Sequence, residues 1–226
     1  MWCVHDCTAP VLSGTADIIN NWMESSRAVP EAVDAVVVGC GFFGLVSLFR
    51  AVEAGLDAVA FEATSSIGGC WNTQANTHSH VTVAEPSYRF PMPDCSFQQS
   101  DYTSREELLS HAANFVEARS LQTRIHFETR VTALHEETDG TFTVTTTQGD
   151  SSPPVETKAK AVILCVGAQT RRREVVWPGE ESFEGDIHYG SGNEVKGPDA
   201  PAVNEAELPW SHRWNQRSFE AKTWSL

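Results

Sequence analysis

Three glycines, at positions 39, 41 and 44 of this 226-residue chain, form the pattern with the clearest chemical meaning. The pattern lies between an apolar run that ends at Val38 and a run with helical spacing. In that context Gly39 permits a tight turn, Gly41 lets the backbone approach a pyrophosphate, and Gly44 allows close packing of helix on strand. The pyrophosphate would lie at the helix N-terminus, beside Phe42. The alternative is a glycine turn that binds no nucleotide.

An acidic residue, Glu62, follows the glycine loop by about 20 residues and ends a second apolar run. A carboxylate there can accept hydrogen bonds from the two ribose hydroxyls of an adenosine, and it repels a 2′-phosphate. The sequence therefore predicts a first nucleotide site at which NADP binds poorly. We expect Glu62 to lie at an exposed strand end, so that its replacement by Ala weakens nucleotide binding more than the fold.

A second pair of glycines, Gly68 and Gly69, precedes Cys70 and Trp71. Two adjacent glycines let the chain pass close to a bulky ligand, and the indole of Trp71 offers it a flat surface. Considered alone, this segment also fits an ordinary glycine turn followed by a core tryptophan. Its combination with the first loop and Glu62 is far more specific than any of the parts.

A strand–helix–strand unit must position these residues. Residues 35–38 and 58–61 are short, almost wholly apolar runs, which are typical of strands buried on both faces. Between them, residues 43–54 have helical spacing and stop at Gly55. This order implies a parallel sheet.

The later part of the chain adds one helix and three strands. Ser104 and Glu107 form a capping box, which predicts a helix over 105–119. The expected strands cover residues 124–134, 141–147 and 161–166, with a hairpin turn at Asp139-Gly140. The predicted fold class is therefore α/β, a Rossmann-type domain with a parallel sheet and an inserted β-hairpin or meander.

Composition divides the chain into an N-terminal extension (1–32), a partial nucleotide-binding domain (33–190) and an acidic, irregular tail (191–226). The net charge is −14, and most of it lies between Glu174 and Glu207. Nucleic-acid binding depends on excess Lys and Arg, so it is not expected. No apolar run approaches the roughly 20 residues of a membrane-spanning helix, so no integral membrane segment is expected.

The N-terminus and the cysteines bear on localisation. The first ten residues have neither a cationic start nor an apolar core, so a secretory signal is not expected. The six cysteines are scattered without the spacing of a zinc site. We therefore expect free thiols, no metal site and a reducing, cytoplasmic location.

Residues 36–71 resemble the FAD-binding opening of flavin-dependent monooxygenases, the class that includes flavin-containing monooxygenases and the Baeyer–Villiger enzymes. Further similar segments are a proline-rich stretch at 90–93, the helix after Ser104, the strand and glycine of residues 163–168, and the pattern from Pro178 to His188. The resemblance covers about residues 33–190.

The resemblance implies an FAD site and a class of reaction. Its glycine loop would hold the FAD pyrophosphate, Glu62 the adenosine ribose, and Gly69 and Trp71 the flavin side. The residues implied in cofactor binding are Gly39, Gly41, Phe42, Gly44, Glu62, Gly69, Trp71, Val131 and Gly167. Val131 would lie near the adenine, and Gly167 belongs to the segment that closes the first part of the domain. No catalytic residue is assigned from the resemblance.

By the same resemblance, the enzyme reduces FAD with NADPH and uses O₂ to oxygenate a small soft nucleophile (N or S) or a ketone. The main departure from the family concerns the second glycine loop, which binds NADPH in those enzymes and has no good counterpart in this sequence. The later candidate, residues 190–197, lacks the third glycine at the right step and precedes prolines instead of a helix, so no NADPH domain is expected in this chain. A non-catalytic flavoprotein remnant or interaction protein with the same fold is therefore the alternative. A disulfide reductase is disfavoured, because no CxxC or CxxxxC pair lies beside the flavin segments.

Overall fold

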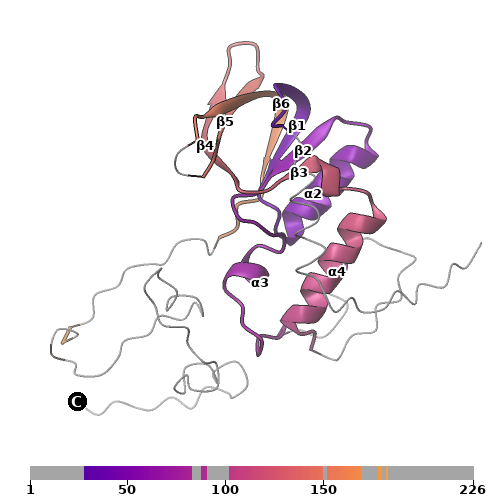
Figure 1. Cartoon of the computed structure of the whole chain (residues 1–226), viewed down its shortest axis with the longest axis vertical. Helices are drawn as coiled ribbons and strands as arrows, with labels where there is room; N and C mark the ends of the chain where they lie inside the picture. The colour runs from indigo at the N-terminus through magenta and orange to yellow at the C-terminus, as the bar shows by residue number, and fades with distance from the viewer. Residues whose placement is uncertain are drawn as a thin grey trace, which may run out of the picture.

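The computed structural model of the chain describes residues 28–82, 88–90, 102–149, 152–168, 178–179 and 182. These residues form one mixed six-stranded sheet with helices packed beside it (Figure 1). The strand order is β3-β2-β1-β6-β5-β4. The elements are β1 (Ala32–Val38), α2 (Phe42–Glu53), β2 (Ala58–Phe61), α3 (Cys70–Thr73), α4 (Arg105–Ala118), the 3₁₀ helix η1 (Gln122–Arg124), β3 (Ile125–His126), β4 (Thr129–Glu136), β5 (Phe142–Gln148) and β6 (Val155–Leu164).

Strand β1 lies in the middle of the sheet, where it pairs in parallel with β2 on one side and with β6 on the other. Its side chains alternate between two apolar clusters. Ala35 and Val37 pack with residues of α2 and α4, whereas Val36 and Val38 pack with residues of β2, β5 and β6. Burial on both faces explains why residues 35–38 of this strand are a continuous apolar run in the sequence.

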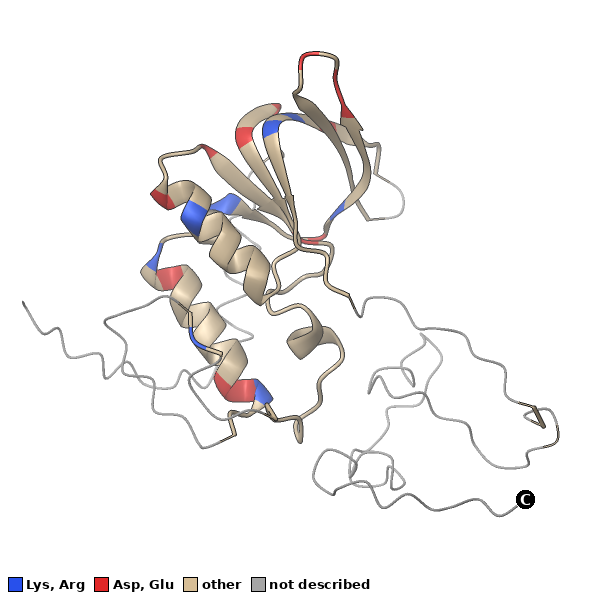
Figure 2. Ribbon diagram, turned by 180° about the vertical axis from the view of Figure 1, so that it is seen from behind, with Lys and Arg blue, Asp and Glu red and all other residues tan. Residues whose placement is uncertain are grey.

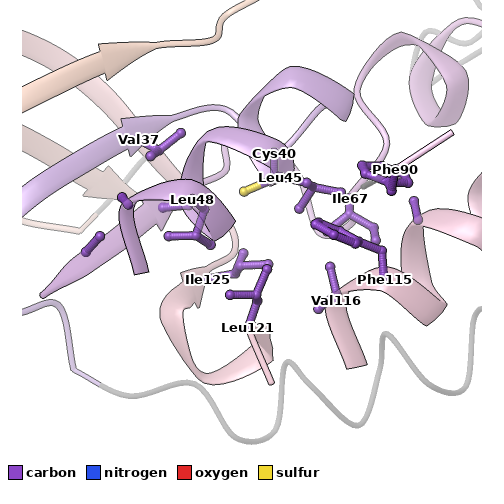
Figure 3. Close-up of a cluster of buried hydrophobic side chains, with 14 of the residues drawn as sticks. Val37, Cys40, Leu45, Leu48, Ile67, Phe90, Phe115, Val116, Leu121 and Ile125 are labelled. Carbon is purple, nitrogen blue, oxygen red and sulfur yellow. The ribbon is translucent and has the colours of Figure 1, made fainter. Parts of the chain in front are cut away.

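The larger apolar cluster lies between the sheet and the helices. Leu45 and Leu48 of α2 meet Phe115 and Val116 of α4 there, and all four are fully buried (Figure 3). Helix α4 begins at the predicted capping box. The Ser104 hydroxyl accepts a hydrogen bond from the Glu107 N–H, and the Glu107 carboxylate accepts one from the Ser104 N–H.

Strands β4, β5 and β6 form an antiparallel meander, which confirms the predicted insertion. The β4–β5 turn is at Asp139-Gly140, as predicted. Gly140 adopts a φ of +81°, and the Asp139 carboxylate accepts hydrogen bonds from the N–H and hydroxyl of Thr141. Strand β6 is shared, because its first half pairs with β5 and most of its length pairs with β1.

The expected strand over residues 124–134 is wrong in one respect. The structure divides it into the end of η1 at Arg124, the short β3, and β4 from Thr129. The break is a turn at which Glu128 adopts a left-handed φ of +51°. Phe127 is buried in this turn, so apolar and polar residues continue to alternate through the break and conceal it.

Strand β6 also begins earlier than expected, at Val155 instead of Ala161. Thr157 and Ala159 are buried and alternate with exposed residues, which is the pattern of a strand covered on one face. The predicted bounds of α2, β2, α4 and β5 agree with the structure to within one residue.

Charged residues of both signs are interspersed over the helices and strands in the view of Figure 2. Examples are the ion pairs Arg50–Glu53 on α2 and Lys160–Asp34 between β6 and β1. In the described part of the chain, no helix is both long enough and apolar enough to cross a membrane. Residues 1–27 of the predicted extension (1–32), the tail from 191 and the segment at 190–197 lie outside the described residues.

Candidate functional site

Three neighbouring strands end at the same edge of the sheet, and each end carries a segment singled out by the sequence. Gly39 follows β1, Glu62 follows β2, and Cys165 to Gly167 follow β6. The Gly39 N–H donates to the Phe61 carbonyl at 2.8 Å. The carboxyl ends of parallel strands are where open α/β sheets bind ligands, so this edge is the candidate site.

Two glycines of the first loop are required by the packing of the protein itself. Gly39 has a φ of +97°, and a Cβ there would lie 2.6 Å from the carbonyl oxygen of Cys165. A Cβ on Gly44 would lie 1.9 Å from the carbonyl oxygen of Gly39. Gly44 therefore lets the first turn of α2 approach the end of β1.

Gly41 differs from these two. It has an ordinary φ of −67°, and its Cβ would make only a normal contact, 3.7 Å from the Cα of Gly69. The chain beside it is the second glycine segment, and the Gly68 N–H donates to the Cys40 carbonyl at 3.0 Å. The fold thus brings the two glycine segments together, backbone against backbone.

Gly41 is the N-cap residue of helix α2, which has no side-chain cap and no acidic residue in its first turn. Its first intrahelical hydrogen bond runs from the Leu45 N–H to the Gly41 carbonyl. The N–H groups before Leu45 therefore have no acceptor within the helix, and they stand at the positive end of its dipole. Phe43, in this turn, is 85% exposed. The arrangement suits a phosphate.

Glu62 is buried, with 7% of its surface exposed, so the expectation of an exposed strand end is wrong. The glycine loop covers its carboxylate, because Oε2 accepts a hydrogen bond from the Cys40 N–H at 2.7 Å. The turn that follows β2 occupies the other oxygen: Oε1 accepts from both the N–H and the hydroxyl of Thr64, each at 2.8 Å. A carboxylate has about four acceptor positions, so one remains on Oε2.

The buried thiol of Cys40 lies beside this carboxylate. Burial raises the pKa of Cys40 well above its ordinary value, and the nearby Glu62 and Cys165 raise it further. The thiol is therefore uncharged at neutral pH. Only the backbone of Cys40, through its N–H and its carbonyl, takes part in the contacts that hold the two loops.

Trp71 lies in the short helix α3, directly after the second glycine pair. Its carbonyl accepts a hydrogen bond from Arg105 Nε at 2.9 Å, which fixes α3 to the start of α4. Its ring meets Tyr88 edge-on, with centroids 5.9 Å apart, and Tyr88 in turn contacts Phe42. Trp71 is only partly buried, so it is not a core tryptophan.

The remaining expected site residues are less closely grouped. Val131, on β4, is half-buried and packs on the apolar cluster that contains Phe61. Gly167 lies three residues beyond the end of β6, is exposed, and has a φ of +73°. Their roles beside the adenine and at the end of the domain stay predictions.

Sequence reasoning missed Thr64 and Arg105. Thr64 stands two residues after the glutamate, a spacing at which a hydroxyl commonly bonds to a nearby acceptor. That signal was present in the sequence. Arg105 has no comparable signal, because its contact with Trp71 joins residues far apart in the chain.

The comparisons with known proteins agree with this geometry. Residues 32–202 match the family described as flavin-binding monooxygenase-like. This chain belongs to that family. The match covers most of its length and includes every segment of the candidate site.

Relatives within the family include both fungal and animal proteins. The chain is 27% identical over 162 residues to the FAD-binding monooxygenase acrE of Aspergillus aculeatus, and 27% identical over 174 residues to dimethylaniline monooxygenase [N-oxide-forming] 2 of Rattus norvegicus. These alignments cover 70% and 68% of this chain, but 27% and 31% of the relatives.

Solved structures give the same picture. A cyclohexanone monooxygenase variant from Rhodococcus sp. Phi1, bound to NADP+, superposes with a TM-score of 0.58 at 27% identity. The match covers 69% of this chain and 30% of that one. This flavin-binding monooxygenase-like chain thus spans about a third or less of the length of the relatives named here, with the Rossmann-type fold of their FAD domain.

Proposed function

We propose that this chain is the FAD-binding portion of a flavin-dependent monooxygenase. The observation that carries the proposal is the meeting of three features at one sheet edge. These are the uncapped N-terminus of α2, the two glycine segments in contact, and the buried Glu62 carboxylate with an acceptor position left. The uncapped helix N-terminus suits a phosphate, and the glycine segments let a ligand approach the backbone closely. The Glu62 carboxylate can accept a hydrogen bond from a ribose hydroxyl.

The residues have distinct tasks in this proposal. The first-turn N–H groups of α2 bind the pyrophosphate, and the absence of a side chain at Gly41 lets it approach. Glu62 accepts hydrogen bonds from the adenosine ribose. Trp71, held by Arg105, lies on the flavin side beside Gly69. When bound, the flavin supplies the reaction of the reduced cofactor with O₂, and the protein orients it and excludes water.

The substrate of the whole protein is proposed only as a class. One relative is named for N-oxide formation, and a solved relative is a cyclohexanone monooxygenase. Small soft nucleophiles and ketones are therefore both retained. NADPH is proposed as the reductant because that solved relative is bound to NADP+. Among the described residues, one strand–glycine loop–helix unit is present, and we assign it to FAD.

Cofactor binding tests the proposal directly. The purified chain should absorb at about 450 nm, or should quench the fluorescence of added FAD on titration. Riboflavin, which lacks the pyrophosphate and the adenosine, is the matched control and should bind far more weakly. A colourless chain that leaves FAD fluorescence unchanged would overturn the assignment.

A non-catalytic flavoprotein with this fold is the second candidate, favoured by the single nucleotide loop among the described residues. Turnover separates the two. The FAD-loaded chain is incubated with NADPH and a thioether, an amine or a ketone, and NADPH oxidation and product are measured. Substrate-dependent NADPH oxidation that yields an oxygenated product would reject the non-catalytic candidate.

A further inference from the structure

The hydroxyl of Thr64 lies between two acceptors. Its Oγ1 is 2.8 Å from Glu62 Oε1 and 3.0 Å from the carbonyl oxygen of Ser66. A hydroxyl carries one proton to donate, so only one of these hydrogen bonds exists at a time. A rotation of the O–H bond exchanges them without moving a heavy atom.

The Glu62 carboxylate has too few free acceptor positions for a whole ribose edge. An adenosine offers two hydroxyls, whereas one position remains on Oε2 and both positions on Oε1 are taken by Thr64. A second ribose hydroxyl can bind only if one of the Oε1 donors leaves.

The N–H of Thr64 is not free to leave. The Thr64 carbonyl accepts a hydrogen bond from the Glu128 N–H at 3.0 Å, and the Glu62 carbonyl accepts one from the Thr129 N–H at 2.8 Å. These bonds fix the backbone on both sides of the Thr64 N–H. The hydroxyl is the donor that has another acceptor within reach.

We propose that the Thr64 hydroxyl gives up its hydrogen bond to Glu62 Oε1 when the nucleotide binds, so that a ribose hydroxyl can donate to Oε1 instead. We call this the hydrogen-bond exchange. In the free protein the Thr64 hydroxyl donates to Oε1 and keeps the buried carboxylate hydrogen-bonded. When the ribose binds, the hydroxyl turns to the Ser66 carbonyl, and a ribose hydroxyl takes its place on Oε1. Thr64 is thus a residue that sets nucleotide affinity and selectivity for a vicinal diol, and the inference rests on the proposed FAD site.

The hydrogen-bond exchange predicts that removal of the Thr64 hydroxyl raises the affinity for a ribose. In the wild-type chain, ribose binding exchanges one charge-assisted hydrogen bond for another and adds only a neutral bond to Ser66. In Thr64→Val, which has nearly the same shape but no hydroxyl, the ribose gains a charge-assisted bond and displaces none. Because charge-assisted bonds are roughly twice as strong as neutral ones, the variant should bind a ribose more tightly. A merely structural role for Thr64 would weaken binding instead.

Calorimetric titration with ADP and with 2′,3′-dideoxy-ADP tests this on the wild-type chain, Thr64→Val and Thr64→Ser. We expect Thr64→Val to bind ADP about threefold to tenfold more tightly than wild type, and Thr64→Ser to return to the wild-type value. The dideoxy nucleotide should bind all three proteins equally. Thr64→Ala, with the same expectation, replaces Thr64→Val if circular dichroism shows that the valine variant does not fold.

The outcomes separate this inference from the proposed function. If the wild-type chain binds ADP and Thr64→Val binds it equally or more weakly, the hydrogen-bond exchange is overturned and the proposed FAD site is not. A tightening that is the same for the dideoxy nucleotide also overturns the exchange, because the ribose hydroxyls would then not be involved. A wild-type chain that binds neither ADP nor FAD overturns both.

Discussion

The three glycines of the first loop meet two different requirements. Gly39 and Gly44 lie where a Cβ would collide with the protein's own backbone, whereas Gly41 has room for one. A side chain at Gly41 is therefore excluded by the proposed ligand and not by the fold. This difference makes it possible to remove binding without removing structure.

Gly41→Ala and Gly44→Ala form a matched pair. We expect Gly41→Ala to keep the wild-type unfolding transition within about 0.5 kcal/mol but to lose FAD binding, because its Cβ meets the pyrophosphate. Gly44→Ala should lower the free energy of unfolding by about 3 kcal/mol or more, because its Cβ overlaps the Gly39 carbonyl. Urea unfolding and FAD titration measure both. Full FAD occupancy in Gly41→Ala would contradict the loop assignment.

Glu62 serves the fold as well as the proposed ligand, because its carboxylate accepts hydrogen bonds from Cys40 and Thr64. Glu62→Gln keeps the shape but turns one acceptor into a donor. We expect unfolding to become easier by about 1–3 kcal/mol and ADP binding to weaken together with it. Glu156→Gln, on an exposed strand position, is the control and should change neither. A Glu62→Gln chain with wild-type stability would contradict the role in the fold.

The raised pKa of Cys40 predicts a loss of stability at alkaline pH. Below about pH 8.5, the thiol is neutral in both the folded and the unfolded chain, so its contribution is constant. Above that pH, the unfolded chain releases the thiol proton while the folded chain retains it. The free energy of unfolding should then fall by up to about 1.4 kcal/mol per pH unit until the folded pKa is reached.

Urea unfolding at pH 7 and pH 10 measures this loss in the wild-type chain and in Cys40→Ala. The variant is destabilised at both pH values by the missing sulfur, but its loss between them should be smaller. An equal loss in the two proteins would show that Cys40 does not titrate as its burial predicts.

Helix α4 shows what sequence can and cannot establish about an element. Its start was predictable because Ser104 and Glu107 satisfy each other's backbone N–H groups locally. The turn at Phe127 and Glu128 was not, because its left-handed residue is a glutamate with no turn signature. The burial of Glu62 was equally hidden, since it depends on a loop brought over it by the fold. Interactions between residues close in the sequence could be predicted, whereas contacts between distant segments could not.

The cap of α4 can be tested by itself. Ser104→Ala removes the hydroxyl that accepts from the Glu107 N–H and should lower the free energy of unfolding by about 1 kcal/mol. Ser110→Ala, in the middle of the same helix, is the control and should not destabilise, since Ala is the better helix former. Chemical unfolding followed by circular dichroism compares the two. Equal effects at both positions would contradict a specific role of the cap.

The described part of the chain joins its two apolar clusters and its candidate site through one sheet. A ligand bound at the strand ends therefore raises the free energy of unfolding of the whole described fold, and not only of a single loop. At a free FAD concentration 100 times its dissociation constant, we expect a gain of about 2.7 kcal/mol in the free energy of unfolding. Thermal unfolding with FAD and with riboflavin measures this gain, and Gly41→Ala should show none. A stabilisation of equal size by riboflavin would contradict a pyrophosphate site.

Strand β6 determines when the sheet can be completed during synthesis, because it is made long after its neighbour β1. It occupies the place between β1 and β5, and its residue Leu164 is the partner of Val38, which lies far earlier in the sequence. During synthesis β1 and β2 emerge long before β6, so the edge of β1 that pairs with β6 has its backbone groups unpaired until β6 is made. Such an edge can template pairing with other chains, and closing so long a loop is slow. Aggregation on the ribosome or soon after release is thus the hazard that this topology creates, and the arrival of β6 ends it.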